Sequence, residues 1–162
     1  MPILDLHVSY CAILSASNIK KWINETPERF QFVVKKHQAL TLHADFRDFS
    51  ETRQELFDAF KEMLAPLQES QKLAMVLVQF PPWFDCSSQN IKYILYVKQQ
   101  LQDYPMCVEF RHQSWFNDQF KEETLSFLTE HQIIHAVVDE PQVKDAGILL
   151  VNRMSSDLLL LD

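Results

Sequence analysis

The stretch that decides the fold is MCVEFRHQSWF, residues 106–116. Its first three residues are apolar, which is typical of the start of a buried β-strand. The run then closes on an acid, a guanidinium and an imidazole (Glu109, Arg111 and His112), and two aromatic residues follow soon afterwards. Charged side chains at the end of an apolar strand require an explanation, because buried charges need partners.

Apolar strands alternate with amphipathic helices along the chain. Residues 50–70 form the clearest predicted helix, since apolar side chains recur at three- and four-residue steps and Thr52 and Glu55 are spaced as a capping box. Residues 73–82 form a nearly continuous apolar run, which is typical of a strand covered on both faces. The expected helices are 17–25, 50–70, 88–102 and 117–131, and the expected strands are 3–10, 30–37, 73–82, 105–111, 133–141 and 156–162. This alternation predicts a parallel sheet with right-handed crossovers.

Polar side chains share one face of each strand near its carboxyl end, because successive side chains point to opposite faces. Parity groups Glu109 and Arg111 with Cys107, Gln79 with Leu77, Lys35 with His37, Asp5 with His7, and Asp139 with His135. An open sheet covered by helices on both faces does not explain why the same face becomes polar at the carboxyl end of every strand. In a barrel, that face points inward, and its polar side chains line the mouth. We therefore predict a barrel whose mouth gathers these groups. His135, deeper on its strand, is interpreted as a hydrogen-bonded core histidine.

Composition limits the class of protein. The 162 residues suffice for one domain with a hydrophobic core, and 47% of them are apolar, so a globular fold is expected. The 15 basic and 22 acidic residues give a net charge of −7, which disfavours binding to nucleic acid or to an anionic membrane. A small-molecule ligand is therefore the favoured partner, nucleic acid is a less favoured one, and no membrane partner is expected.

Further local features indicate a cytoplasmic protein. The three cysteines have no CxxC spacing, and the chain opens without the basic and apolar regions of a secretory signal. No apolar run approaches the roughly 18 residues of a membrane span. The single glycine, Gly147, leaves no glycine-rich phosphate loop. Cys107 lies inside a strand pattern and is interpreted as a small buried hydrophobe.

Four stretches resemble the YecE-like family, also called domain of unknown function 72, and are most similar to its YunF-like branch. They are ETPERFQFVVK (25–35), VLVQFPPWF (76–84), CVEFRHQSWF (107–116) and VVDEPQ (137–142). The resemblance implies a TIM-type β/α barrel related to the xylose-isomerase and endonuclease IV barrels, and it implies no settled activity. It points to residues that parity also selects: Lys35, Gln79, Glu109, Arg111, His112, Trp115 and Asp139.

The resemblance also implies a truncated member of the family. Family members usually begin with a further strand–helix unit and continue beyond the last strand expected here, and a full barrel needs about 250 residues. The expected fold class is therefore α/β, an incomplete (β/α) TIM-type barrel in which parallel strands alternate with helices and the first and last elements are lacking. Residues 1–162 are expected to form a single domain, the central portion of that barrel.

The predicted function is that of a hydrolase-type enzyme whose mouth binds a small anionic or sugar-like ligand. Arg111 and Lys35 could hold a phosphate or carboxylate, and Glu109 or Asp139 could act as general base. The tryptophans could stack on a sugar or base. The predicted catalytic residues are Glu109, Asp139 and Lys35, and the predicted substrate-binding residues are Arg111, Gln79, His112, Trp115, Trp83 and Asp5.

Three alternatives stay open at this point. The first is a charge-balanced layer in which the acids and cations satisfy one another without a substrate. The second is a metal-dependent, endonuclease-IV-like nucleic-acid hydrolase, since His7, His37, Glu109 and Asp139 are permissible ligands of a divalent metal. No residue is assigned to a metal on this basis. The third is a non-catalytic, truncated remnant that self-associates through open barrel edges.

Overall fold

The computed structural model describes residues 3–6 and 8–136, and the structural statements below concern that part of the chain. Within it, five strands pair in the order β1-β2-β3-β4-β5. Contacts between residues group the chain into two compact units, residues 1–77 and 78–162, and the boundary falls inside β3 (Leu73–Gln79). Each unit is described by itself.

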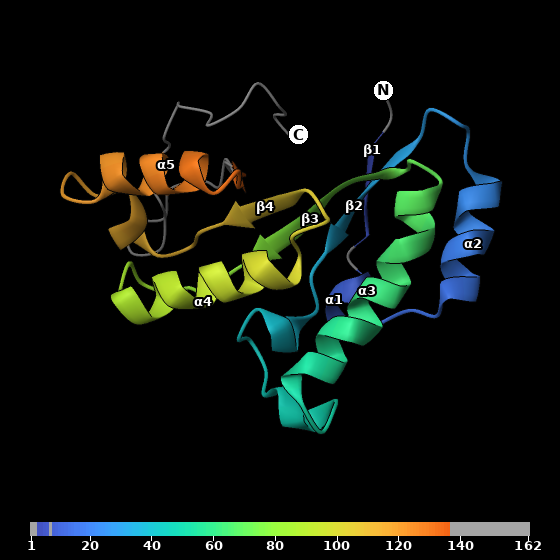
Figure 1. Ribbon diagram of the computed structural model, residues 1–162, viewed down its shortest axis with the longest axis horizontal. Helices are drawn as coiled ribbons and strands as arrows, with labels where there is room; N and C mark the ends of the chain where they lie inside the picture. The colour runs from blue at the N-terminus through green and yellow to red at the C-terminus, as the bar shows by residue number, and fades with distance from the viewer. Residues whose placement is uncertain (1–2, 7, 137–162) are drawn as a thin grey trace. The chain divides into compact units, whose positions relative to one another are not determined.

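In the first unit, β1 (Ile3–Leu6), β2 (Gln31–Lys35) and the first part of β3 run parallel. The register places Asp5 opposite Val33 and Lys35 opposite Leu77. The helical elements of this unit are α1 (Val8–Cys11), α2 (Ala16–Glu25), η1 (Gln38–Leu40), η2 (Phe46–Asp48) and α3 (Arg53–Glu69). Figure 1 shows α2 and α3 lying side by side, and the two helices are in contact.

The long helix α3 begins where its capping residues predict. The Thr52 side chain accepts a hydrogen bond from the Glu55 backbone, and the Glu55 carboxylate accepts one from the Thr52 backbone, so the predicted capping box is confirmed. One face of the helix is buried, as its three- and four-residue spacing predicts. The buried residues of α3 are Leu56, Phe57, Phe60, Met63, Leu64, Pro66 and Leu67.

The second unit holds the end of β3, α4 (Ser88–Gln100), β4 (Met106–Glu109), η3 (Gln113–Phe116), α5 (Lys121–Glu130) and β5 (Ile134–His135). β4 and β5 pair in parallel, with Val108 opposite His135. In Figure 1, α4 and α5 flank β4. Helix α5 begins four residues later than the predicted start at 117, because the Asn117 side chain accepts hydrogen bonds from two backbone groups and forms a turn first.

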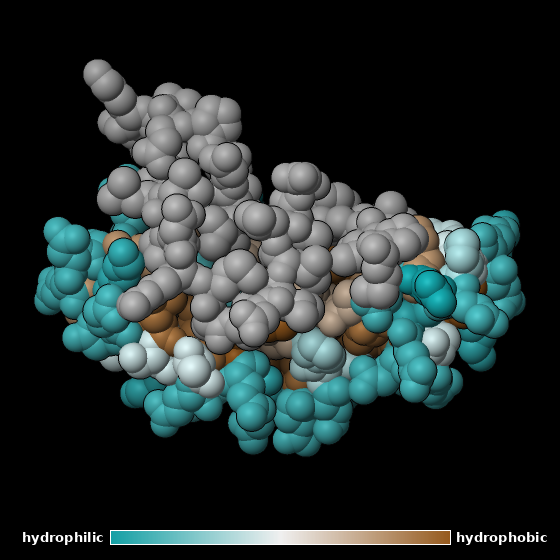
Figure 2. Space-filling view, turned by 90° about the horizontal axis from the view of Figure 1, so that it is seen from above, coloured by the Kyte–Doolittle hydropathy of each residue, from teal (hydrophilic) through white to brown (hydrophobic). Residues whose placement is uncertain are grey.

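The hydrophobic core of the second unit contains a layer of nearly parallel aromatic rings. Phe80 and Phe84 stack with ring centres 4.0 Å apart, and Phe110 and Trp115 stack at 4.1 Å. All four side chains are almost completely buried. Stacked aromatic rings of this kind contribute beyond their buried area, so they hold the loops after β3 and β4 against the strands. In the face shown in Figure 2, most of the visible described surface is hydrophilic, with smaller hydrophobic areas.

The structure confirms the predicted alternation of parallel strands and helices and changes some boundaries. The predicted strand 3–10 ends at Leu6, and α1 begins at Val8, because the Ser9 hydroxyl donates to the Leu6 carbonyl at 2.7 Å and turns the chain. The described part of the predicted strand 133–141 is Ile134–His135, and 156–162 lies outside the described residues. The incomplete barrel and the single domain stay predictions. None of the described helices is both long and apolar enough to cross a membrane.

Candidate functional site

Gln79 and Glu109 end two strands of the second unit at the same level. The Phe80 backbone N–H donates to the Glu109 carbonyl oxygen at 3.1 Å. In a pair of parallel strands, the residue that donates such a bond comes one position after the residue that lies opposite the acceptor. The Lys36 N–H, for example, donates to the Leu77 carbonyl, and Lys35 lies opposite Leu77. Gln79 therefore lies opposite Glu109, and both are the last residues of their strands.

The Glu109 carboxylate is buried and pairs with Arg111. Glu109 is 5% exposed, and Arg111 Nε donates to Glu109 Oε1 at 2.5 Å. A buried carboxylate is costly without partners, so the guanidinium offsets part of its desolvation penalty. The Arg111 side chain is 25% exposed, so one end of the pair reaches the surface. The contact orients the guanidinium at the carboxyl end of β4.

His112 is held by a short hydrogen-bonded chain. Ser114 Oγ accepts from the Cys86 backbone N–H at 2.7 Å, which leaves the Ser114 hydroxyl proton for His112 Nδ1 at 2.8 Å. The Ser114 backbone N–H also donates to this nitrogen, at 3.2 Å. Because Nδ1 accepts, neutral His112 carries its own proton on Nε2, which is a hydrogen-bond donor. This chain joins the loop after β3 to the loop after β4.

The two predicted tryptophans lie in different surroundings. Trp115 is 1% exposed, and its indole N–H donates to the Phe84 carbonyl at 2.7 Å. It therefore belongs to the core, whereas the sequence predicts it among the substrate-binding residues. A buried indole needs a partner for its N–H, and the Phe84 carbonyl supplies one. Trp83 is 59% exposed and rests on Phe84 through an edge contact. Of these two tryptophans, Trp83 presents the accessible ring.

In the first unit, Lys35 ends β2 and lies with its Nζ 4.9 Å from the centre of the Tyr10 ring. Asp5 lies on β1 opposite Val33, and His7 lies outside the described residues. His37 is 1% exposed and accepts the Ala39 backbone N–H, so it begins η1. Burial lowers the pKa of His37, and a hydrogen bond to the Cys11 backbone partly opposes this effect.

Sequence reasoning missed Tyr10, Thr41 and His43, which lie close to Lys35 or to one another. The Tyr10 and His43 rings meet edge to face with centres 5.5 Å apart, and Thr41 Oγ1 lies 2.9 Å from His43 Nδ1. Tyr10 was assigned to a strand, where it would have had no such role. No periodic signal marks Thr41 and His43, because they belong to an irregular loop.

The structure brings together only part of the predicted site. Gln79, Glu109, Arg111 and His112 lie at the carboxyl ends of β3 and β4 in the second unit, where Glu109 and Arg111 are in direct contact. Asp5 and Lys35 belong to the first unit, and their predicted convergence with that group stays a prediction. Asp139 lies outside the described residues.

The register changes the position of His135. Because His135 lies opposite Val108, it shares the apolar face of β4 with Phe110 and packs at 4.6 Å on the Phe116 ring, away from the face of Glu109. Burial lowers its pKa to about 4. The interpretation as a core histidine is confirmed, but Nδ1 has no hydrogen-bond partner among the described residues, so the expected hydrogen bond is absent at that nitrogen.

Cys107 has the inert surroundings that the sequence predicts. It is 2% exposed, and burial, followed by the nearby Glu109 charge, raises the pKa of its thiol to about 12. The thiol therefore stays protonated and packs as a small hydrophobe. Within residues 3–6 and 8–136, no group of three or more His, Cys, Asp and Glu side chains could hold a metal ion. The metal-dependent alternative thus has no ligand set in this part of the chain.

The fold and the site together define a parallel α/β protein with polar groups at the carboxyl ends of its strands. A DUF72 family protein from Enterococcus faecalis V583 superposes with a TM-score of 0.92 at 29% identity, covering 95% of this chain and 56% of that chain. A DUF72 family protein from Thermotoga maritima MSB8 superposes with a TM-score of 0.78 at 30% identity, covering 97% of this chain and 57% of that chain.

The sequence comparisons agree with these structures. The model of the family described as "Protein of unknown function DUF72" matches residues 1–161, and the chain belongs to this family. The predicted membership is thereby confirmed. UPF0759 protein YunF of Bacillus subtilis (strain 168) is 46% identical over 156 residues, which cover 96% of this chain and 55% of the relative. The chain therefore spans a little over half the length of the relatives it matches.

Proposed function

We propose that the carboxyl end of β4 binds the anionic group of a small molecule, as part of a hydrolase-type enzyme, and that Arg111 is the cation that holds this group. The observation that supports the proposal is the ion pair between the buried Glu109 carboxylate and Arg111 Nε. A guanidinium is a planar fork that matches phosphate and carboxylate oxygens, and it binds best when it is already oriented. The Glu109 contact supplies that orientation.

The neighbouring residues supply distinct interactions. Of the two roles open to Glu109, its contact with Arg111 favours positioning of the guanidinium over action as a general base. Gln79 lies opposite Glu109 and offers an amide, and His112 offers its Nε2–H to a ligand oxygen. The exposed Trp83 ring offers an apolar face to a sugar or base. Hydrolysis also needs a general base, and Asp139 is the other group that the sequence predicts for this role.

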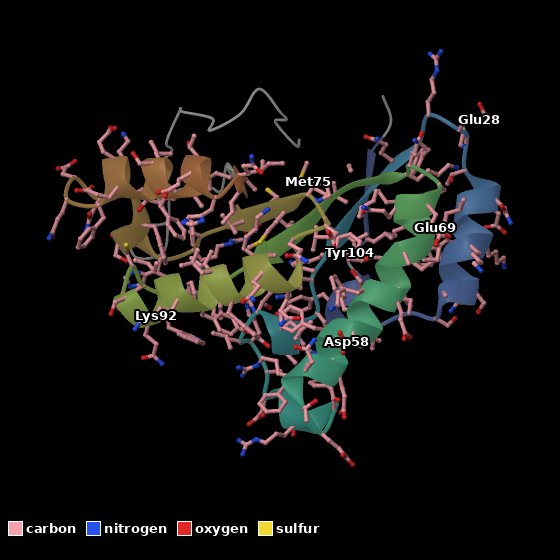
Figure 3. The ribbon with its side chains drawn as sticks, in the orientation of Figure 1. Glu28, Asp58, Glu69, Met75, Lys92 and Tyr104 are labelled. Atoms are coloured by element: carbon pink, nitrogen blue, oxygen red, sulfur yellow. The ribbon has the colours of Figure 1, made fainter. Side chains whose placement is uncertain are left out.

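Binding of inorganic phosphate tests the role of Arg111. We expect calorimetric titration to show phosphate binding to the wild-type chain, and Arg111→Ala to weaken it by about tenfold or more, since the charged contact is lost. Arg111→Lys keeps the charge without the fork and should bind with intermediate affinity. Lys92→Ala is the matched control, because Lys92 is exposed on α4 of the same unit and points away from the strands (Figure 3).

Two results would contradict the proposal. One is that the wild type, Arg111→Lys and Arg111→Ala all bind phosphate with equal affinity. The other is no binding by the wild type at low ionic strength, which would favour the self-satisfied charge layer. Arg111→Ala removes one partner of the buried Glu109 carboxylate and is the variant that is most at risk of unfolding, so circular dichroism is recorded for each variant. Arg111→Lys retains a partner for Glu109 and keeps the test decisive if Arg111→Ala does not fold.

A further inference from the structure

The loops that follow β3 and β4 are joined at two points, both within the second unit. The Trp115 indole N–H donates to the Phe84 carbonyl at 2.7 Å, and both side chains are almost completely buried. The Cys86 backbone N–H donates to Ser114 Oγ, also at 2.7 Å. Because the two bonds involve nearly adjacent residues of each loop, together they hold Ser114 in place beside His112.

The start of α4 fixes the donor that reaches Ser114. Cys86 comes directly before Ser87, the residue that caps α4 by accepting a hydrogen bond from the Asn90 backbone. The Asn90 side-chain amide in turn donates to the Asp85 carbonyl at 3.0 Å and to the Asp85 carboxylate at 2.9 Å. The residues on either side of Cys86 are therefore bonded to the first turn of the helix, and the Cys86 N–H has a fixed direction.

The bonds of Ser114 determine which nitrogen of His112 carries the proton. The Cys86 N–H can only donate, so Ser114 Oγ accepts there and turns its own proton to His112 Nδ1, 2.8 Å away. The Ser114 backbone N–H also can only donate, and it reaches the same nitrogen at 3.2 Å. This second bond requires Nδ1 to accept whichever way the hydroxyl points. Neutral His112 is therefore protonated on Nε2.

The backbone opposes the other tautomer. With its proton on Nδ1, His112 would turn a donor toward the Ser114 N–H, which is also a donor, and the bond between them would be lost. In contrast, no residue within 3–6 and 8–136 accepts the Nε2 proton, and His112 is partly exposed. Nε2 carries a hydrogen and no lone pair, so it can donate to a ligand oxygen but cannot serve as a base or a metal ligand.

We propose that Ser114 is a positioning residue, which holds His112 so that its Nε2–H donates to a phosphoryl or carboxylate oxygen of the ligand. The inference rests on the proposed function of the carboxyl end of β4, where His112 directly follows Arg111. It assigns His112 to recognition of an oxygen and excludes it from proton abstraction. A donor that is already oriented binds without the cost of ordering its side chain when the ligand arrives.

Nitrogen-15 NMR of the histidine side chains tests the arrangement in mildly alkaline solution, where histidines are neutral. We expect the Nε2–H tautomer for His112, with its signals assigned by their loss in His112→Asn. Inorganic phosphate should move the Nε2 signal. The opposite tautomer in the wild type would overturn the inference. So would an unmoved Nε2 signal under conditions in which calorimetry detects phosphate binding, and that result would leave the proposal for Arg111 intact.

Phosphate affinities of matched variants test the role of each residue. His112→Asn keeps an oxygen that can accept the Ser114 N–H, and asparagine is a favoured capping residue, but the variant lacks the Nε2–H. We expect it to bind phosphate about tenfold more weakly than the wild type, because one hydrogen bond to a charged ligand is lost. Ser114→Ala should weaken binding by a smaller factor, and Ser114→Thr should restore it. Ser126→Ala is the control, because Ser126 is exposed on α5 of the same unit.

A double variant separates positioning from general support of the fold. If Ser114 acts through His112, adding Ser114→Ala to His112→Asn causes no further loss of phosphate affinity. A further loss would overturn the positioning role. Equal affinities of His112→Asn and the wild type, together with weaker binding by Arg111→Lys, would overturn this inference alone. Absence of phosphate binding by the wild type would overturn both this inference and the proposed function.

Discussion

Single residues in this protein show how strongly burial governs ionisation. Lys36 has no exposed surface, although it follows the partly exposed Lys35 directly in the chain. Its Nζ donates to the Leu40 carbonyl at 3.2 Å and lies 4.2 Å from the centre of the Phe57 ring. Burial lowers the pKa of Lys36 well below its ordinary value, and the Arg53 charge adds to this effect. Lys36 alternates with Lys35 and His37 in the sequence, so it projects from the opposite side of the backbone, and its contact with Phe57 places it against α3.

The buried His135 predicts a loss of stability in mild acid. Its pKa is lowered from 6.5 to about 4 because burial penalises the charged form. The unfolded chain therefore binds a proton between these pH values that the folded chain does not bind, so the free energy of unfolding falls as the pH falls through this window. The fall due to this histidine should reach about 3 kcal/mol by pH 4.

Urea unfolding at several pH values from 7 to 4 measures this effect. We expect His135→Leu to retain its stability through the window in which the wild type loses it, because the apolar side chain cannot take up a proton. His131→Gln removes a histidine outside the core and should follow the wild type. Parallel decline of His135→Leu and the wild type would show that carboxylates alone cause the acid sensitivity.

At the level of the secondary-structure element, the stability of α3 depends on the capping residues at its N-terminus. The reciprocal bonds of Thr52 and Glu55 satisfy backbone donors that the first helical turn leaves without partners. Thr52→Ala should lower the free energy of unfolding by about 1 kcal/mol. Glu62→Ala, on the exposed face of the same helix, is the control.

A double-mutant cycle of Thr52→Ala and Glu55→Ala shows whether the two residues act together. We expect the combined loss to be smaller than the sum of the single losses, because either substitution already breaks the reciprocal box. Equal stability of Thr52→Ala and Glu62→Ala in chemical denaturation would mean that water replaces the cap at no cost.

Over the whole molecule, β3 contributes residues to both compact units. Melting of this one strand would remove hydrogen-bond partners within each unit, so we expect a single cooperative unfolding transition, in keeping with the predicted single domain. Trp22→Phe leaves Trp83 and Trp115 as the tryptophans, and both belong to the second unit. The unfolding midpoint of this variant measured by tryptophan fluorescence should therefore equal the midpoint measured by far-ultraviolet circular dichroism, which reports the helices of both units. Two separate midpoints would show that the units unfold independently.

Much of the fold could be predicted because its signals are local. The apolar spacing of α3, its capping box and the run that forms β3 each lie within a few consecutive residues. The register of β5 could not be predicted, because parity within a strand does not say which neighbour its residues face. His135 shows the consequence, since it faces Phe116 and not the side of Glu109.

By itself, the sequence determined the family, the alternation of parallel strands with helices, and the position of Gln79 and Glu109 at strand ends, because hydrophobic periodicity and strand parity are properties of consecutive residues. Only the tertiary structure decided which side chains meet. It buried Trp115 in the core, with its indole N–H on the Phe84 carbonyl, and it brought His43 to Tyr10. Such contacts depend on register and on loop hydrogen bonds between residues distant in the chain, and neither leaves a periodic mark on the sequence.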